Sequence, residues 1–160
     1  MERFAGTVEV LAEVDASDIA AWIAAIPFED WHQQHSLPDA QIRPAMMTDL
    51  MWHDFGWITE PLVSGVMAAH FPGCRETQRM LSTVMPGHSI EPHTDSQPPH
   101  WICRVHVPLT SNPESKFIVG GVAHRLEPGW AYRVNTEVVH SVENAGRTPR
   151  IHMMWDCLRA

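Results

Sequence analysis

The second half of the chain is a series of short β-type runs separated by turn residues. Pro-Gly at 86–87, Gly-Gly at 120–121 and Pro-Gly at 128–129 punctuate it at strand-length intervals, with no helical periodicity between them. Because strands joined without helical crossovers pair in an antiparallel manner, this half predicts an antiparallel sandwich or barrel. The runs cover residues 77–85, 101–109, 116–119, 122–126, 130–134, 138–143 and 150–157.

The first half carries a mixed pattern. Residues 4–11 alternate as a strand does, and capping residues at the start of 15–26 predict an Ala-rich helix that ends before a proline. Residues 28–47 are rich in Pro, Gln, His and Asp and predict an irregular connection. A second helix is expected over 59–70, with Pro61 in its first turn, where a helix tolerates proline.

The composition fits one folded domain. The chain has 160 residues, of which 44% are hydrophobic and 19% are charged, so it is neither a disordered segment nor a membrane protein. We expect a single domain over residues 1–160, in which a mixed, helical N-terminal layer (1–75) covers a β core (76–160). The expected fold class is therefore mainly β with an α-helical layer.

The net charge and the cysteine content limit the classes of molecule that the chain is expected to bind and the compartment in which it is expected to fold. The net charge is −8 and Lys116 is the only lysine, so nucleic acid and anionic membranes are poor partners. No apolar run approaches the roughly 20 residues that cross a bilayer, and the N-terminus lacks a signal-peptide pattern. Cys74, Cys103 and Cys157 are odd in number and widely spaced, which favours thiols in a reducing cytoplasm. Neither pattern indicates an oligomeric state.

Histidines supply the main chemical hypothesis, because the chain contains 11 of them and histidine is the commonest metal ligand. His93 and Asp95 stand two residues apart in an extended segment, so their side chains point to the same side. His140, on a later strand, would complete a set of two histidines and one carboxylate. This set is typical of non-haem Fe(II) oxygenases, because it leaves coordination positions open for a cosubstrate and O₂.

An H-x-D pair alone is weak evidence, because a chain this rich in His and Asp has roughly an even chance of containing one. Its surroundings strengthen the hypothesis. Arg150 follows His140 by ten residues across a turn, so its guanidinium should point back near the metal. A guanidinium fork matches the far end of a dicarboxylate. The alternative for Arg150 is an ordinary surface charge on an edge strand.

The same residues resemble a known family. The stretch from Ser82 to Asp156 is similar to the aspartyl/asparaginyl β-hydroxylases, a branch of the 2-oxoglutarate/Fe(II) oxygenases. In addition, the Gly-Thr-Val-Glu segment at 6–9 resembles the opening of bacterial proline hydroxylases. The pieces that match, in the order and with the spacing of the family, are residues 82–88, 92–95, 104–109, 127–130, 140–144 and 150–156.

The resemblance implies a double-stranded β-helix, which is the jelly roll of cupin-like proteins, with Fe(II) at its mouth and 2-oxoglutarate and O₂ as cosubstrates. It implies that His93 and His140 are iron ligands. Ser82 and Arg150 would hold the distal carboxylate of 2-oxoglutarate. The expected reaction is hydroxylation of a substrate C–H bond with release of succinate and CO₂.

Three further positions bear on the substrate. The resemblance places Arg104 and His106 near the other carboxylate of 2-oxoglutarate or near a substrate carboxylate. Animal members that modify peptides have glycine at the position of Asp95, whereas Asp95 restores the triad of bacterial enzymes that act on free amino acids. We therefore expect a small carboxylate-bearing substrate, with a free amino acid or its derivative favoured over an Asp/Asn-type peptide side chain.

Two other functions fit the same ligands. One is a cupin-like module that binds a metal and a small acid without oxidising it, because a jelly roll hosts many functions. The other is a Zn²⁺-dependent hydrolase or isomerase, since two histidines and a carboxylate also suit zinc.

Overall fold

The computed structural model describes residues 1–26, 32–33 and 47–160. Most of the expected irregular connection over 28–47 therefore lies outside the described residues. The elements in chain order are β1 (Val8–Glu13), α1 (Ser17–Ala24), β2 (His32–Gln33), β3 (Met47–Met51), α2 (Trp52–His70), β4 (Cys74–Val84), β5 (His88–His93), β6 (Trp101–Thr110), β7 (Ser115–Val119), β8 (Val122–His124), β9 (Trp130–Val134), β10 (His140–Asn144) and β11 (Arg150–Arg159).

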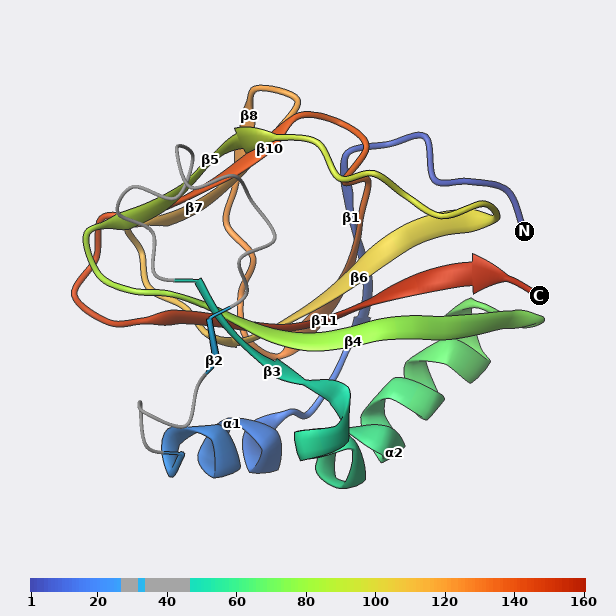
Figure 1. The fold of residues 1–160 in the computed structure, drawn as a ribbon, viewed down its shortest axis with the longest axis horizontal. Coiled ribbons are helices and arrows are strands. Elements are labelled where there is room, and N and C mark those ends of the chain that lie inside the picture. The colour runs from blue at the N-terminus through green and yellow to red at the C-terminus, as the bar shows by residue number, and fades with distance from the viewer. Residues whose placement is uncertain (27–31, 34–46) are drawn as a thin grey trace.

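Two antiparallel sheets face each other (Figure 1). The larger sheet has the strand order β1-β9-β6-β11-β4-β3-β2, and the smaller sheet has the order β5-β10-β7-β8. Apolar side chains from both sheets fill the space between them, with Phe117 and Val119 of the smaller sheet packed in one cluster with Val84, Tyr132 and Val134 of the larger. This arrangement confirms the predicted jelly roll.

The helices cover the outer face of the larger sheet (Figure 1). Ile19 and Ile23 of α1 and Phe55 and Val63 of α2 belong to one buried cluster with sheet residues such as Trp155. The N-terminal part also extends the sheet itself, because β1 forms one edge and β3 and β2 continue the other. None of the helices in the described residues is both long and apolar enough to span a bilayer.

The second helix begins seven residues earlier than predicted. Pro61 lies inside α2, which starts at Trp52, so the interpretation of this proline as a first-turn residue was wrong. Phe55, one turn before the predicted start, is fully buried, and burying this ring favours an earlier helical start. The Thr59 hydroxyl donates to the carbonyl oxygens of Phe55 and Gly56 at 3.1 and 3.3 Å.

The predicted strand runs all correspond to observed strands, with ends that differ by a few residues. Three strands were missed: β2 lies within the stretch expected to be irregular, and β3 and β5 were not predicted as strands. β5 was expected only as an extended segment, but it pairs with β10 in an antiparallel ladder in which His93 lies opposite His140. The turn before β5 needs Gly87, whose φ is 75°, a conformation that side chains other than glycine rarely adopt. That turn carries the chain from the larger sheet to the smaller one.

A groove of about 520 Å³ lies on the helical side, between β1, α1 and α2. Its lining includes Glu13, Asp18 and Leu62, and none of the residues predicted for the metal site. The residues predicted for the metal site therefore do not line this groove.

Candidate metal centre

His93 and His140 face each other because β5 and β10 are paired neighbours. Their α-carbons are register partners, and the centroids of their imidazole rings lie 4.3 Å apart. Asp95 follows β5, and its backbone N–H donates to the carbonyl oxygen of Thr136 at 2.9 Å. Gln97 donates in turn to the Thr136 hydroxyl at 2.6 Å. These bonds hold the segment after β5 against the chain that leads into β10.

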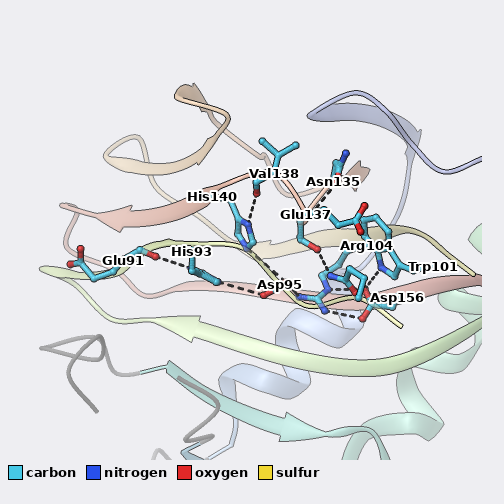
Figure 2. A network of polar contacts seen from close by, with 12 residues as sticks. Glu91, His93, Asp95, Trp101, Arg104, Asn135, Glu137, Val138, His140 and Asp156 are labelled. Carbon is cyan, nitrogen blue, oxygen red and sulfur yellow. Dashed lines mark hydrogen bonds and ion pairs between the residues drawn. The ribbon is translucent and has the colours of Figure 1, made fainter. Parts of the chain in front are cut away.

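Backbone carbonyls fix the tautomers of both histidines. His93 Nδ1 lies 2.7 Å from the carbonyl oxygen of Glu91, and His140 Nδ1 lies 3.0 Å from that of Val138. Because a carbonyl oxygen only accepts, each Nδ1 carries a proton, and Nε2 is the atom that can offer a lone pair to a metal. Burial lowers the pKa of His140, which favours its neutral form. Both Nε2 atoms face Asp95, at 3.6 Å from His93 and 3.8 Å from His140 (Figure 2).

These three residues fit a divalent transition metal. Their ligand atoms all lie within 4.8 Å of one another, and they form the only such cluster found in the part of the chain that the structure describes. Two neutral imidazoles and one carboxylate on a single side suit Fe(II) and leave positions open for other ligands. Carbonyl-anchored Nδ1–H groups are the outer support that metal-ligating histidines usually have. The donor set therefore fits the predicted iron site.

Arg104 connects Asp95 to a buried carboxylate. Its Nη1 donates to Asp95 Oδ2 at 2.6 Å, while Nε and Nη2 grip the two oxygens of Asp156 at 2.9 and 2.8 Å. Asp156 is fully buried and also accepts from Trp101 Nε1 at 2.9 Å. Figure 2 shows this chain of contacts leading from Asp156 to the candidate metal ligands. Sequence reasoning assigned no role to Asp156, although a charged residue inside an apolar strand was a signal for one.

Arg150 begins β11 of the larger sheet, and its side chain is buried on the face that meets the smaller sheet. It is 2% exposed, and burial lowers its pKa to about 9, so it remains charged at neutral pH. Its Nη2 lies 2.8 Å from His152 Nδ1, and its guanidinium lies 5.7 Å from the centroid of the Phe117 ring. Among the described residues, no carboxylate forms an ion pair with Arg150. The buried Ser82 of β4 is the register partner of His152, so its side chain shares this face of the sheet.

His106 lies on the same strand as Arg104, two residues further on, so both side chains point to the same face of the sheet. It is buried, and its Nε2 has no hydrogen-bond partner. The Phe117 ring lies 5.3 Å from the His106 ring and 6.0 Å from the His140 ring. Together with the contacts above, these distances place every predicted site residue between the two sheets.

A match to a family model identifies the protein family of this chain. The model described as aspartyl/asparaginyl beta-hydroxylase matches residues 58–160, which include all of the predicted site residues. The chain belongs to this family. It is a 2-oxoglutarate-dependent, non-haem Fe(II) oxygenase of the hydroxylase kind, and the described residues hold a candidate site for the iron.

Solved structures share the fold of this β-hydroxylase family member. The 2-oxoglutarate complex of the viral collagen prolyl hydroxylase from Paramecium Bursaria Chlorella virus-1 has a TM-score of 0.58 and 11% identity, covering 98% of each chain. A Pseudomonas putida prolyl-4-hydroxylase has a TM-score of 0.62 and 14% identity, covering 98% of this chain and 94% of its own. SnoN, an α-ketoglutarate-dependent epimerase from nogalamycin biosynthesis, has a TM-score of 0.64 and 14% identity, covering 94% and 77%. No curated protein matches the sequence.

Two buried neutral histidines make the stability of this β-hydroxylase family member sensitive to acid. Burial, with the Arg150 charge as the next cause, lowers the pKa of both His106 and His152 well below the usual value. Below a pH of about 6.5, these two histidines therefore bind protons in the unfolded chain but not in the folded chain. The free energy of unfolding then falls as the pH falls. Each histidine contributes about 1.4 kcal/mol per pH unit in that range.

We expect urea denaturation of the metal-free protein at pH 7.5, 6.5 and 5.5 to show this loss. A His152→Leu variant should lose less free energy of unfolding per pH unit than the native protein, by about the contribution of one histidine. Equal pH slopes in the two proteins would contradict the assignment of His152 as a buried neutral group.

Proposed function

We propose that the chain hydroxylates a C–H bond of a small carboxylate-bearing substrate, with a free amino acid or its derivative favoured over an Asp/Asn-type peptide side chain. His93, Asp95 and His140 would hold Fe(II), and Arg150 with Ser82 would hold the distal carboxylate of 2-oxoglutarate. The observation that carries the proposal is the convergence of three side chains that could ligate a metal in the same interior as a buried arginine, which has no carboxylate partner among the described residues.

The bound iron and 2-oxoglutarate supply the oxidising power, since 2-oxoglutarate, O₂ and a C–H bond give succinate, CO₂ and a C–OH group. The protein orients the reacting groups. The carbonyls of Glu91 and Val138 hold both Nε2 lone pairs toward one point. A dicarboxylate on Arg150 would compensate its charge, and the Phe117 ring beside Arg150 and His140 would limit the access of water to this interior.

For Arg104 we propose a positioning role toward Asp95. A bidentate grip on the buried Asp156 fixes the guanidinium, and the fixed guanidinium directs the carboxylate of Asp95 toward His93 and His140. Arg104 lies directly opposite Asp156 in the β6–β11 ladder, which makes the pair a cross-strand contact. The charge of Arg104 is therefore balanced by protein carboxylates, in contrast to that of Arg150.

Replacing Asp156 with asparagine should weaken metal binding by about 10- to 100-fold, which is the usual cost of losing an outer support of a metal ligand. The amide has the same shape but cannot hold Arg104 by two charged bonds. Titration of Mn²⁺ followed by electron paramagnetic resonance measures the affinity. Trp101→Phe is the control, because it removes one neutral donor from Asp156 and leaves the Arg104 pair. Unchanged Mn²⁺ affinity in Asp156→Asn would contradict the positioning role.

The preference for a small substrate is supported by Asp95. It completes the triad that the chain shares by resemblance with bacterial enzymes acting on free amino acids. Two of the structural neighbours are named as prolyl hydroxylases, so proline and its derivatives belong among the first candidates.

The test is a screen for succinate formation and for a mass gain of one oxygen atom. The native protein, with Fe(II), 2-oxoglutarate and O₂, is offered free amino acids and, in parallel, the same residues within short blocked peptides. We expect a free amino acid or its derivative to stimulate succinate formation and to gain the oxygen. Oxidation of the peptides alone would overturn the small-substrate proposal, and no oxidation of either set would count against the amino-acid class.

A further inference from the structure

His152 lies between Arg150 and His106 and contacts both through one atom. Its Nδ1 lies 2.8 Å from Arg150 Nη2 and 3.3 Å from His106 Nδ1. All three side chains are at least 96% buried, and the two imidazole rings meet edge to face with centroids 5.6 Å apart. The sequence left His152 without a partner, and none of the roles described above uses it as a binding residue.

The arginine decides where the protons of the two histidines lie. A guanidinium only donates, so His152 Nδ1 must be an acceptor and the proton of this ring sits on Nε2. His106 Nδ1 approaches the same lone pair and must therefore carry a proton itself, because two lone pairs at this distance would repel each other. The remaining nitrogen, His106 Nε2, then presents a lone pair. This nitrogen is one of the buried side-chain atoms of the described residues that have no hydrogen-bond partner.

The hydrogen bond to a neutral His152 also leaves the charge of Arg150 uncompensated. Two other arginines of the described chain with largely buried side chains are compensated by carboxylates, since Arg79 pairs with Glu60 and Glu76 and Arg104 pairs with Asp95 and Asp156. His152 orients Arg150 by accepting one hydrogen bond but adds no negative charge. The guanidinium thus keeps its full charge for an incoming anion.

We propose that His152 is a positioning residue that sets the hydrogen-bonding character of the pocket. It holds Arg150 as an uncompensated cation for a carboxylate, and it fixes His106 as an acceptor for an N–H or O–H donor. The first half rests on the proposed function of Arg150. The second half assigns His106 to the substrate, because 2-oxoglutarate at neutral pH has no proton to donate. The substrate class is therefore one with an amine, amide or hydroxyl donor on the side that faces His106.

The tautomers are measured directly by long-range ¹H–¹⁵N NMR of metal-free, ¹⁵N-histidine-labelled protein at pH about 7.5. We expect His106 as the Nδ1–H tautomer and His152 as the Nε2–H tautomer, with assignments from single His→Asn variants. An Nε2–H tautomer of His106 in the native protein would overturn the proposal, and this result does not depend on activity.

The charge argument is tested by calorimetric titration of 2-oxoglutarate into Mn²⁺-loaded protein. His152→Asp should weaken binding by roughly tenfold or more, because the new carboxylate compensates Arg150. His152→Asn keeps a neutral acceptor and should bind more tightly than His152→Asp. His124→Asn on β8 is the control and should bind as the native protein does. Equal affinities in His152→Asp and His152→Asn would overturn the inference.

The same titrations separate this inference from the proposed function. If the native protein does not bind 2-oxoglutarate, the role of Arg150 as its anchor fails. The tautomers then still decide whether His152 organises the two neighbouring side chains. If the native protein binds 2-oxoglutarate and the His152 variants bind it equally well, the role of His152 alone fails.

Discussion

His140→Ala should abolish the Fe(II)-dependent conversion of 2-oxoglutarate to succinate. His140 supplies one of only two imidazole Nε2 atoms in the cluster, and the pair that remains, His93 and Asp95, is a bidentate set with one neutral ligand. Loss of a ligand from a three-ligand site weakens the metal and distorts the geometry on which oxygenase chemistry depends. We expect succinate formation at the level of the protein-free background.

The matched control is His70→Ala. His70 lies in the last turn of α2, on the helical side of the larger sheet, and its replacement should leave turnover unchanged. Mn²⁺ titration of both variants shows whether the loss follows the metal, and thermal unfolding confirms that both are folded. Full turnover in His140→Ala would remove this residue from the metal site, and with it the triad.

Arg150→Met should weaken the binding of 2-oxoglutarate by about 30-fold to several thousand-fold, which corresponds to the 2–5 kcal/mol lost when one partner of a buried charge pair is removed. The same change should not lower the free energy of unfolding in the absence of 2-oxoglutarate. Burial of Arg150 without a carboxylate disfavours its charge, as its lowered pKa shows. Methionine fills similar space without that cost.

Calorimetry with Mn²⁺-loaded protein measures the affinity, and urea denaturation measures the stability. Arg125→Met is the control, because Arg125 pairs with Glu127 at the surface, where its side chain is 51% exposed. Loss of stability together with unchanged 2-oxoglutarate affinity would mean that Arg150 serves the fold and not the cosubstrate.

The candidate metal cluster was accessible from the sequence because most of its geometry is local. His93 and Asp95 share a side through the two-residue period of an extended chain, and His140 followed from the resemblance and from strand spacing. β5 itself was missed, because residues 88–93 include two histidines, a proline and a glutamate, which are not typical strand formers. The pairing of β5 with β10 is a tertiary contact, and no local pattern reports it.

The partners of His152 and Asp156 could not be assigned from the sequence because their contacts are long-range. His152 meets His106, which lies 46 positions away, and Asp156 meets Arg104 and Trp101, which lie 52 and 55 positions away. The β4–β11 register also shifts near Gln78, whose φ is 51°, so simple alternation does not predict which residues lie opposite each other across the ladder. Hydrogen-bond polarity, such as the tautomer of His106, depends on these neighbours and leaves no mark in the sequence.

Metal-specific turnover of 2-oxoglutarate tests the oxygenase assignment most directly. The protein is purified without oxygen, loaded in parallel with Fe(II) or Zn²⁺, given 2-oxoglutarate and the candidate amino acids, and exposed to air while succinate is measured. We expect succinate from the Fe(II) protein, equal in amount to the 2-oxoglutarate consumed, and none from the Zn²⁺ protein. Tight 2-oxoglutarate binding with no succinate from the Fe(II) protein, or a reaction that only the Zn²⁺ protein supports, would contradict the assignment.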